Sequence, residues 1–224
     1  MSKVRSVRAT RGERTRWLPG DGLILPSIGS LTHAITIKAT AREIWPWLVQ
    51  MGAGSRAGWY SYDRLDNDGV QSAERIIPEL QRLEVGMIMP WLPRATEGFT
   101  VLDFAPERHL VLGWLVPGAT TPRLTWTFVL EPRPGCTRLI VRGRAERGYR
   151  FFGVPRWMSK AAARTVHFFM QRKQLIGIAR RAEGGASVPG APPGSLTSAA
   201  SRTRLAQGAS ELVDASPGRD RAPS

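Results

Sequence analysis

Cysteine is nearly absent from this chain, which has one, Cys136, among 224 residues. A single cysteine excludes an internal disulfide framework. Long apolar runs are also missing, because no stretch approaches the ~18 residues that a membrane-spanning helix needs. The N-terminus is basic but lacks the ~7–15-residue apolar segment of a signal peptide. We therefore expect a cytoplasmic protein.

Acidic residues are scarce as well, since 18 Asp and Glu stand against 32 Lys and Arg, which gives a formal net charge of +14. Residues 1–17 contain six basic residues and one acidic residue, and residues 156–183 contain seven and one. Such an excess favours contact with anionic membranes or nucleic acid, although charged runs are more often solvated faces. We expect weak contact with an anionic membrane surface and disfavour nucleic acid as a partner.

The sequence has few residues suited to metal or covalent chemistry. Its three histidines, His33, His109 and His167, lack a spacing that would unite them as metal ligands. No nucleophile elbow, P-loop or Cys/His cluster is present. We therefore expect no metal and no cofactor, and binding is favoured over catalysis.

Composition divides the chain into three parts. Residues 1–20 are predicted to form a basic, disordered arm, and residues 21–183 to form a single domain. From residue 184 to 224, Ala, Ser, Pro and Gly dominate and apolar periodicity disappears. Such a segment buries too little apolar surface to offset the entropy of ordering, so we expect a disordered tail.

The apolar pattern within the domain predicts an α+β fold. Residues 31–38 alternate as a strand does, and Thr40 with Glu43 forms a capping box for a helix over residues 41–51. A short helix is expected at residues 59–65, and another turn, interrupted by Pro78, at residues 73–80. A period of two then predicts an antiparallel meander, with strands at residues 85–91, 99–104, 110–115, 123–130 and 137–145.

A long C-terminal helix is predicted from Pro155 to about Glu183. Its apolar stripe contains Met158, Ala161, Ala162, Thr165, Phe168, Phe169, Leu175, Ile176 and Ala179. A lone helix with such a stripe must bury it, and the apolar face of the sheet is the available partner. We therefore predict a curved antiparallel sheet wrapped around this helix.

Four stretches carry a family resemblance, at residues 41–52, 58–67, 72–81 and 170–183. With the order of elements, they resemble an uncharacterised bacterial branch of the SRPBCC (START/Bet v 1-like, polyketide cyclase/lipid transport) superfamily over roughly residues 17–183. The resemblance implies a helix-grip fold with a cavity between sheet and helix. It brings no catalytic set, and fold alone does not determine chemistry.

Large apolar side chains are the candidate ligand-binding residues, because small-molecule pockets are mostly apolar with a few polar groups. Plain core packing is the simpler interpretation for each residue taken alone. The resemblance favours a pocket for the set as a whole. The candidate ligand-binding residues are His33, Trp59, Tyr62, Met89, Trp91, Trp114, Trp126, Phe128 and Phe168.

Weak catalytic candidates are His33, Tyr62 and Asp63. His33 shares a strand face with Ile35 and Ile37, where it would orient a ligand or act as an acid or base. A core histidine bonded to a neighbour is the plainer interpretation. Tyr62 next to Asp63 would polarise a carbonyl, or would simply tie the second helix to the sheet.

Three hypotheses follow. The first is binding or carriage of a hydrophobic small molecule, lipid-like or polyaromatic, in a cavity between sheet and C-terminal helix. The second is a polyketide cyclase-like or dehydratase-like enzyme that uses acid/base residues in that cavity. The third is peripheral contact with a membrane or nucleic acid through the basic arm and helix.

Overall fold

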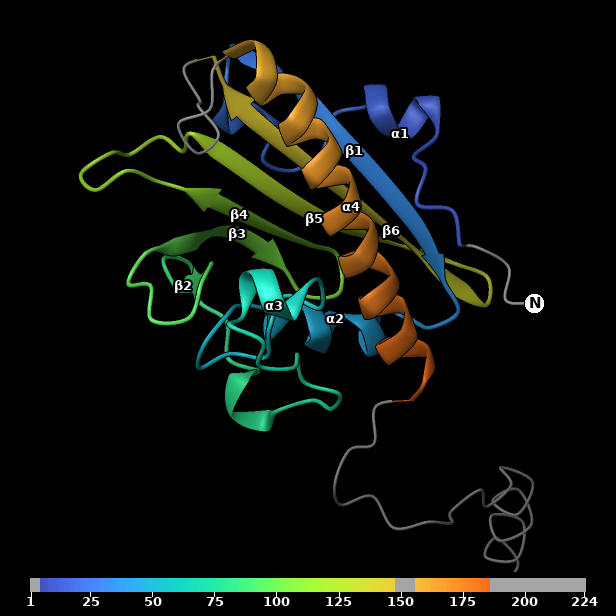
Figure 1. Cartoon of the computed structure of the whole chain (residues 1–224). Helices are drawn as coiled ribbons and strands as arrows, with labels where there is room; N and C mark the ends of the chain where they lie inside the picture. The colour runs from blue at the N-terminus through green and yellow to red at the C-terminus, as the bar shows by residue number, and fades with distance from the viewer. Residues whose placement is uncertain (1–4, 148–155, 186–224) are drawn as a thin grey trace, which may run out of the picture. The chain divides into compact units, whose positions relative to one another are not determined.

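Six strands form one antiparallel sheet in the order β1-β6-β5-β4-β3-β2 (Figure 1). The computed structural model describes residues 5–147 and 156–185, except for the side chains of residues 156–164 and 166. The strands are β1 (Ser27–Ile37), β2 (Ile88–Pro90), β3 (Gly98–Ala105), β4 (His109–Trp114), β5 (Leu124–Arg133) and β6 (Cys136–Glu146). Apart from β1, which pairs with β6, sequential strands are neighbours, as the predicted meander requires.

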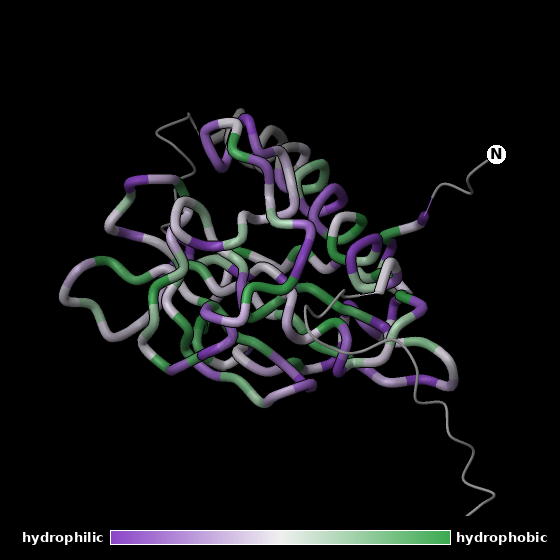
Figure 2. The backbone as a smooth tube through the Cα atoms, turned by 90° about the horizontal axis from the view of Figure 1, so that it is seen from below, coloured by the Kyte–Doolittle hydropathy of each residue, from purple (hydrophilic) through white to green (hydrophobic). Residues whose placement is uncertain are grey.

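The inner face of the sheet is apolar and packs against the long helix α4 (Arg156–Glu183). Ile35 and Ile37 of β1 share one core with Leu139 and Val141 of β6. Among the described residues, α4 contacts β1 and the helix α2 (Ala41–Val49). Hydrophobic segments gather in the middle of the backbone in Figure 2. The predicted α+β helix-grip fold is therefore confirmed.

Helix α2 begins where the sequence places it. The Thr40 hydroxyl accepts a hydrogen bond from the Glu43 N–H, and the Glu43 carboxylate accepts one from the Thr40 N–H. The helix ends at Val49, earlier than predicted. The Arg56 guanidinium donates to the carbonyls of Val49 and Met51 and so satisfies acceptors that the helix end leaves open.

The other short elements are smaller than the sequence pattern indicates. The segment predicted as a helix at residues 59–65 contains only the single turn α3 (Asp63–Asp66). The segment at residues 73–80 contains the 3-10 turn η2 (Pro78–Leu80), and a second such turn, η1 (Asp21–Leu23), precedes β1. The strand predicted over residues 85–91 is reduced to β2. These segments pack as loops against the core, because glycines and prolines interrupt regular structure.

Helix α4 lies very close to the loop that precedes α3. A Cβ atom on Gly177 would lie 2.4 Å from the carbonyl oxygen of Tyr60, so only glycine fits. The Arg181 guanidinium lies 4.6 Å from the centre of the Tyr60 ring and donates to the Ala73 carbonyl at 2.7 Å. These contacts determine where the C-terminal half of α4 lies.

The stripe of α4 that faces the protein core differs from the predicted one. Its buried apolar residues include Leu175 and Ala179, as predicted, whereas Phe168, Phe169 and Thr165 are exposed. Two buried glutamines, Gln171 and Gln174, continue the stripe instead. The structure does not describe the side chains of Met158, Ala161 and Ala162. Of the tail predicted from residue 184, only residues 184 and 185 are described.

Residues 5–20 differ from the disordered arm that the composition of residues 1–20 predicts, and residues 1–4 lie outside the described residues. From Arg5 onward the chain packs against the sheet and includes the helix α1 (Arg11–Thr15). Val7 and Ala9 are buried, and the Val7 carbonyl accepts the Ala34 N–H at 3.1 Å. The segment therefore covers the outer edge of β1, where unpaired backbone groups would otherwise be open to another strand.

Arginines on the outer face of β6 hold this segment in place. Arg138 bonds to Glu13 at 2.8 Å, and Arg142, which is buried, bonds to Asp21 at 2.5 Å. Arg142 also donates to three backbone carbonyls, those of Glu13, Arg14 and Arg16. Both acidic groups of the N-terminal segment thus point inward, which composition alone could not reveal.

The part of the chain that the structure describes contains no helix long and apolar enough to cross a membrane.

Candidate ligand-binding site

Aromatic rings line the inner face of the sheet from β2 to β5. Trp126 lies at their centre, with ring centroids 5.4 Å from Trp59, 5.2 Å from Phe99 and 5.0 Å from Phe128. Trp91 extends the row, 6.4 Å from Phe99 and 5.7 Å from Trp114. We call these six residues the aromatic cluster: Trp59, Trp91, Phe99, Trp114, Trp126 and Phe128.

Strand register brings these residues together from distant parts of the sequence. Trp114, Trp126 and Phe128 alternate with outward-facing Thr125 and Thr127 along β4 and β5. Phe99 of β3 pairs with Met89 of β2, which is fully buried beneath the rings. Because side chains alternate across a strand, a shift of one residue would move the whole row to the outer face.

The aromatic cluster is only partly covered by the described side chains. Trp59 and Phe128 are buried, whereas Trp91, Phe99, Trp114 and Trp126 each retain partial exposure. Helix α4 packs mainly against β1 and α2, and Figure 1 shows α4 crossing the sheet on the side of β1, β6 and β5. The rings on β3 and β4 thus lie beside the helix.

Two imidazoles lie next to this cluster on the side of β1. The ring of His33 is 5.6 Å from that of His167 on α4 and 5.7 Å from that of Phe168. His167 occupies space left by Gly143, where a Cβ would lie 3.6 Å from the imidazole. Since Gly143 pairs with Trp126, the imidazole of His167 and the indole of Trp126 occupy neighbouring positions.

Each of these imidazoles has one buried nitrogen without a hydrogen-bond partner among the described residues, Nδ1 of His33 and Nε2 of His167. Burial lowers the pKa of His33, and burial together with the nearby charge of His33 lowers the pKa of His167 to about 4. Both rings are therefore neutral near pH 7. A neutral imidazole nitrogen is a donor or an acceptor depending on the tautomer, and an unpartnered one carries a free-energy cost.

Two glutamines complete the polar edge. The Trp126 Nε1–H donates to Gln171 at 2.9 Å, and the Gln171 amide donates to Gln174 at 2.8 Å. The Gln174 amide in turn points at the sulfur of Met51, a weak acceptor, at 3.7 Å. The site thus combines aromatic surface with neutral polar groups.

The structure brings most of the predicted residues into one region. Trp59, Met89, Trp91, Trp114, Trp126 and Phe128 belong to or underlie the aromatic cluster, and His33 and Phe168 lie together at its edge. Trp59 also donates its Nε1–H to the Pro90 carbonyl at 3.2 Å.

Tyr62 and Asp63 lie elsewhere. Tyr62 is exposed, with the Lys173 ammonium 6.0 Å from the centre of its ring. The Asp63 carboxylate accepts a hydrogen bond from the Ser72 hydroxyl at 2.5 Å, which closes the loop after α3. These contacts join α3 to the loop that follows it and to α4, and the predicted tie of this pair to the sheet stays a prediction.

Sequence reasoning missed Phe99, His167, Gln171 and Gln174. His167 was considered only as a metal ligand, and its 134-residue separation from His33 hides their proximity. The sequence did contain a signal for this polar edge. Two glutamines follow His167 by four and seven residues, and so lie on the same face of the helix within an apolar stripe. Among the described residues, no group of three or more His, Cys, Asp or Glu side chains could hold a metal ion.

The space between the C-terminal half of α4 and the sheet is filled by side chains, since Leu175, Ile178 and Ala179 are fully buried against Ile35 and Leu139. Two open hollows, of about 260 Å³ and about 310 Å³, lie elsewhere, at residues 38–43 with 132–137 and at residues 23–26 with 121–122 and 146–147. Neither hollow is lined by a residue of the aromatic cluster, and the cavity predicted between sheet and helix is absent along this described half of α4.

Comparisons with known proteins end at the level of fold. No family model and no curated protein matches the chain. Among solved structures, a Polyketide_cyc-like protein from Corynebacterium glutamicum is 16% identical with a TM-score of 0.44, over 70% of this chain and 92% of that one. CalU16 from Micromonospora echinospora is 15% identical with a TM-score of 0.38, over 75% and 74%. The Aha1 dimer from Colwellia psychrerythraea is 16% identical with a TM-score of 0.36, over 68% and 99%.

At TM-scores below 0.5 these neighbours carry no argument. The strand order and register establish the fold. The chain is a helix-grip α+β protein with an aromatic cluster on its inner sheet face and two neutral imidazoles, one on β1 and one on α4.

Proposed function

We propose that the protein binds a hydrophobic, aromatic small molecule that carries a hydroxyl group. The observation that carries the proposal is the pair of unpartnered imidazole nitrogens, on His33 and His167, beside partly exposed aromatic rings. The rings offer stacking surface, and each offset ring contact contributes about 0.5–1.5 kcal/mol. A ligand hydroxyl would satisfy at least one orphaned nitrogen.

The contact between hydroxyl and imidazole supplies selectivity. A neutral hydrogen bond contributes about 0.5–1.5 kcal/mol, which corresponds to a preference of roughly two- to tenfold. The preference is measured with two probes of the same ring system, 1-naphthol and naphthalene, by quenching of tryptophan fluorescence. We expect saturable binding of both probes and tighter binding of 1-naphthol.

Substitutions test the contributions of the two imidazoles and of the aromatic cluster separately. His33→Leu and His167→Leu each reduce the preference for 1-naphthol, whereas His109→Leu, on a residue bonded to Asp103, leaves it unchanged. Trp114→Ala weakens both probes about tenfold, and Trp17→Ala, on an exposed residue of the N-terminal segment, weakens neither. Non-saturable quenching, or equal affinities for the two probes in the unmodified protein, refutes the proposal.

Turnover is a second candidate function, favoured by the same two imidazoles. A neutral imidazole with an unpartnered nitrogen is able to accept a proton from an acidic ligand group, and the lowered pKa of both rings makes each of them a weak base. His33 and His167 would then act as acid/base residues on the bound aromatic molecule. Exchange of ring protons of 1-naphthol with D₂O, faster with the protein than with His167→Leu, would support this activity, and equal rates would exclude it for this probe.

A further inference from the structure

The N-terminal segment, taken here as residues 5–28, carries its acidic and basic side chains on different sides. Its two acidic residues, Glu13 and Asp21, are buried and paired with arginines of β6. Its arginines at positions 8, 11, 14 and 16 are exposed, and of these Arg16 pairs with Glu131 of β5. The solvent side of residues 8–28 therefore displays positive charge and no carboxylate of its own.

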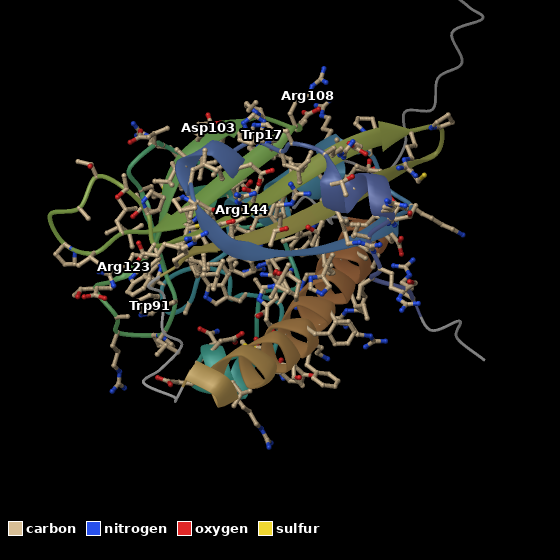
Figure 3. All side chains as sticks on the ribbon, turned by 90° about the horizontal axis from the view of Figure 1, so that it is seen from above. Trp17, Trp91, Asp103, Arg108, Arg123 and Arg144 are labelled. Atoms are coloured by element: carbon tan, nitrogen blue, oxygen red, sulfur yellow. The ribbon has the colours of Figure 1, made fainter. Side chains whose placement is uncertain are left out.

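The same segment exposes large apolar side chains. Trp17 is 67% exposed, Leu25 66%, Ile28 49% and Leu23 42%. Three of them lie close along the chain, because the Trp17 ring lies against Gly22, and Leu23 and Leu25 line one hollow with Pro122, Glu146 and Arg147. Figure 3 looks onto this face, with the blue N-terminal segment crossing the sheet near the labelled Trp17 and Arg144.

From this arrangement we infer that residues 8–28 form a membrane-docking surface for anionic lipid bilayers. Here the docking surface means Arg8, Arg11, Arg14, Arg16, Trp17, Leu23, Leu25 and Ile28. Basic residues attract an anionic bilayer, and the exposed aliphatic and indole groups enter the region between headgroups and acyl chains. Tryptophan prefers that boundary because its ring is amphipathic.

Burial of Glu13 and Asp21 is the structural basis of the inference. The segment is attached to a folded sheet through Arg138 and Arg142, so its apolar groups are held outward before any membrane is present. Docking then requires little ordering, which lowers its entropic cost. Nucleic acid is the less suitable partner, because phosphate contacts make no use of Leu23, Leu25 and Ile28.

The test measures sedimentation of the full chain with vesicles of phosphatidylcholine alone or with 30% phosphatidylglycerol, at about 0.05 M and 0.5 M salt. We expect partition into the anionic vesicles that weakens with salt, since exposed charges are screened. A blue shift of tryptophan emission, abolished in Trp17→Phe, reports the entry of that ring. Duplex DNA is a parallel probe.

Matched variants test the assigned surface. Arg8→Gln/Arg11→Gln lowers partition by roughly fivefold per arginine, and Trp17→Ser/Leu25→Ser lowers it at least tenfold. The controls carry the same changes on the loop around α3: Arg64→Gln/Arg75→Gln, and Leu65→Ser/Val70→Ser, whose residues are 67% and 62% exposed. The controls change partition less than twofold.

Three results would overturn the inference. One is equal partition of the docking-surface variants and their controls. Another is no sedimentation with anionic vesicles at low salt. The third is DNA binding that exceeds vesicle binding and does not respond to Trp17→Ser/Leu25→Ser. None of these results bears on naphthol binding, so the two proposals fail independently.

Discussion

Replacing Glu13 by Gln tests whether the N-terminal segment is part of the folded domain. Glu13 is 6% exposed, and hydrogen bonds from Arg138, followed by those from Thr10, lower its pKa from 4.5 to about 2. A difference of about 2.5 pKa units corresponds to roughly 3 kcal/mol of stabilisation by the charged form. Glutamine keeps the shape and loses the charge, so we expect the free energy of unfolding to fall by about 2–3 kcal/mol at pH 7.

The dependence of this loss on pH has a definite sign. The pKa of Glu13 is lower in the folded state than in the unfolded state, so its contribution is complete above about pH 5 and disappears as the pH falls toward about 2. Between pH 7 and pH 3.5 the difference between the unmodified protein and Glu13→Gln should shrink by about 1.4 kcal/mol.

Urea unfolding followed by circular dichroism measures both quantities. Glu84→Gln is the matched control, because Glu84 pairs with Arg82 at 2.7 Å but both side chains are exposed, 57% and 83%. An exposed pair contributes about 0–1 kcal/mol. A loss below about 0.5 kcal/mol for Glu13→Gln at pH 7, or a loss equal to that of Glu84→Gln, would refute the reasoning.

The remaining predictions concern α4, the imidazoles and the start of α2. Gly177→Ala should destabilise the protein by about 1–3 kcal/mol in thermal unfolding despite the higher helix propensity of alanine, because its Cβ would lie 2.4 Å from the Tyr60 carbonyl, whereas Gly12→Ala, with nothing within 4 Å, should be neutral or stabilising. Burial lowers the pKa of His167 from 6.5 to about 4, so the free energy of unfolding should fall by about 2–3 kcal/mol as the pH is lowered from 6.5 to about 4. The free energy of unfolding of His167→Leu should depend less steeply on pH in this window. An unchanged slope would contradict the burial of this imidazole. Thr40→Ala should cost about 1 kcal/mol in urea unfolding by removing the capping box of α2, and a change below about 0.3 kcal/mol would show that the cap contributes little.

Local pattern was sufficient for the sheet and the helices that have clear periodicity. The strand containing Ile35 and Ile37 and the strand containing Leu139 and Val141 were predicted with the correct inner faces, because a two-residue period assigns each side chain to one face. The capping box of Thr40 and Glu43 was equally local. The short segments around α3 and η2 were predicted too long, since apolar residues there meet the core from loops.

The N-terminal segment and the imidazole pair could not be predicted, because both depend on contacts between distant residues. Glu13 and Arg138 are 125 residues apart. A segment rich in arginines and small residues is predicted to be disordered when its contact with Arg138 is not known. His33 and His167 meet only because Gly143 leaves space between β1 and α4. For the aromatic cluster, alternation predicted the faces of Trp126 and Phe128, while the role of Phe99 depends on the pairing of β2 with β3.

Intermolecular NOEs from bound 1-naphthol are the most direct test of the proposed binding site. We expect NOEs to the ring protons of Trp114 and Trp126, together with a shift of the imidazole ¹⁵N signal of His33 Nδ1 or His167 Nε2 when naphthalene is replaced by 1-naphthol. Signals confined to exposed side chains such as Tyr62 or Leu65, with both imidazoles unchanged, would contradict it.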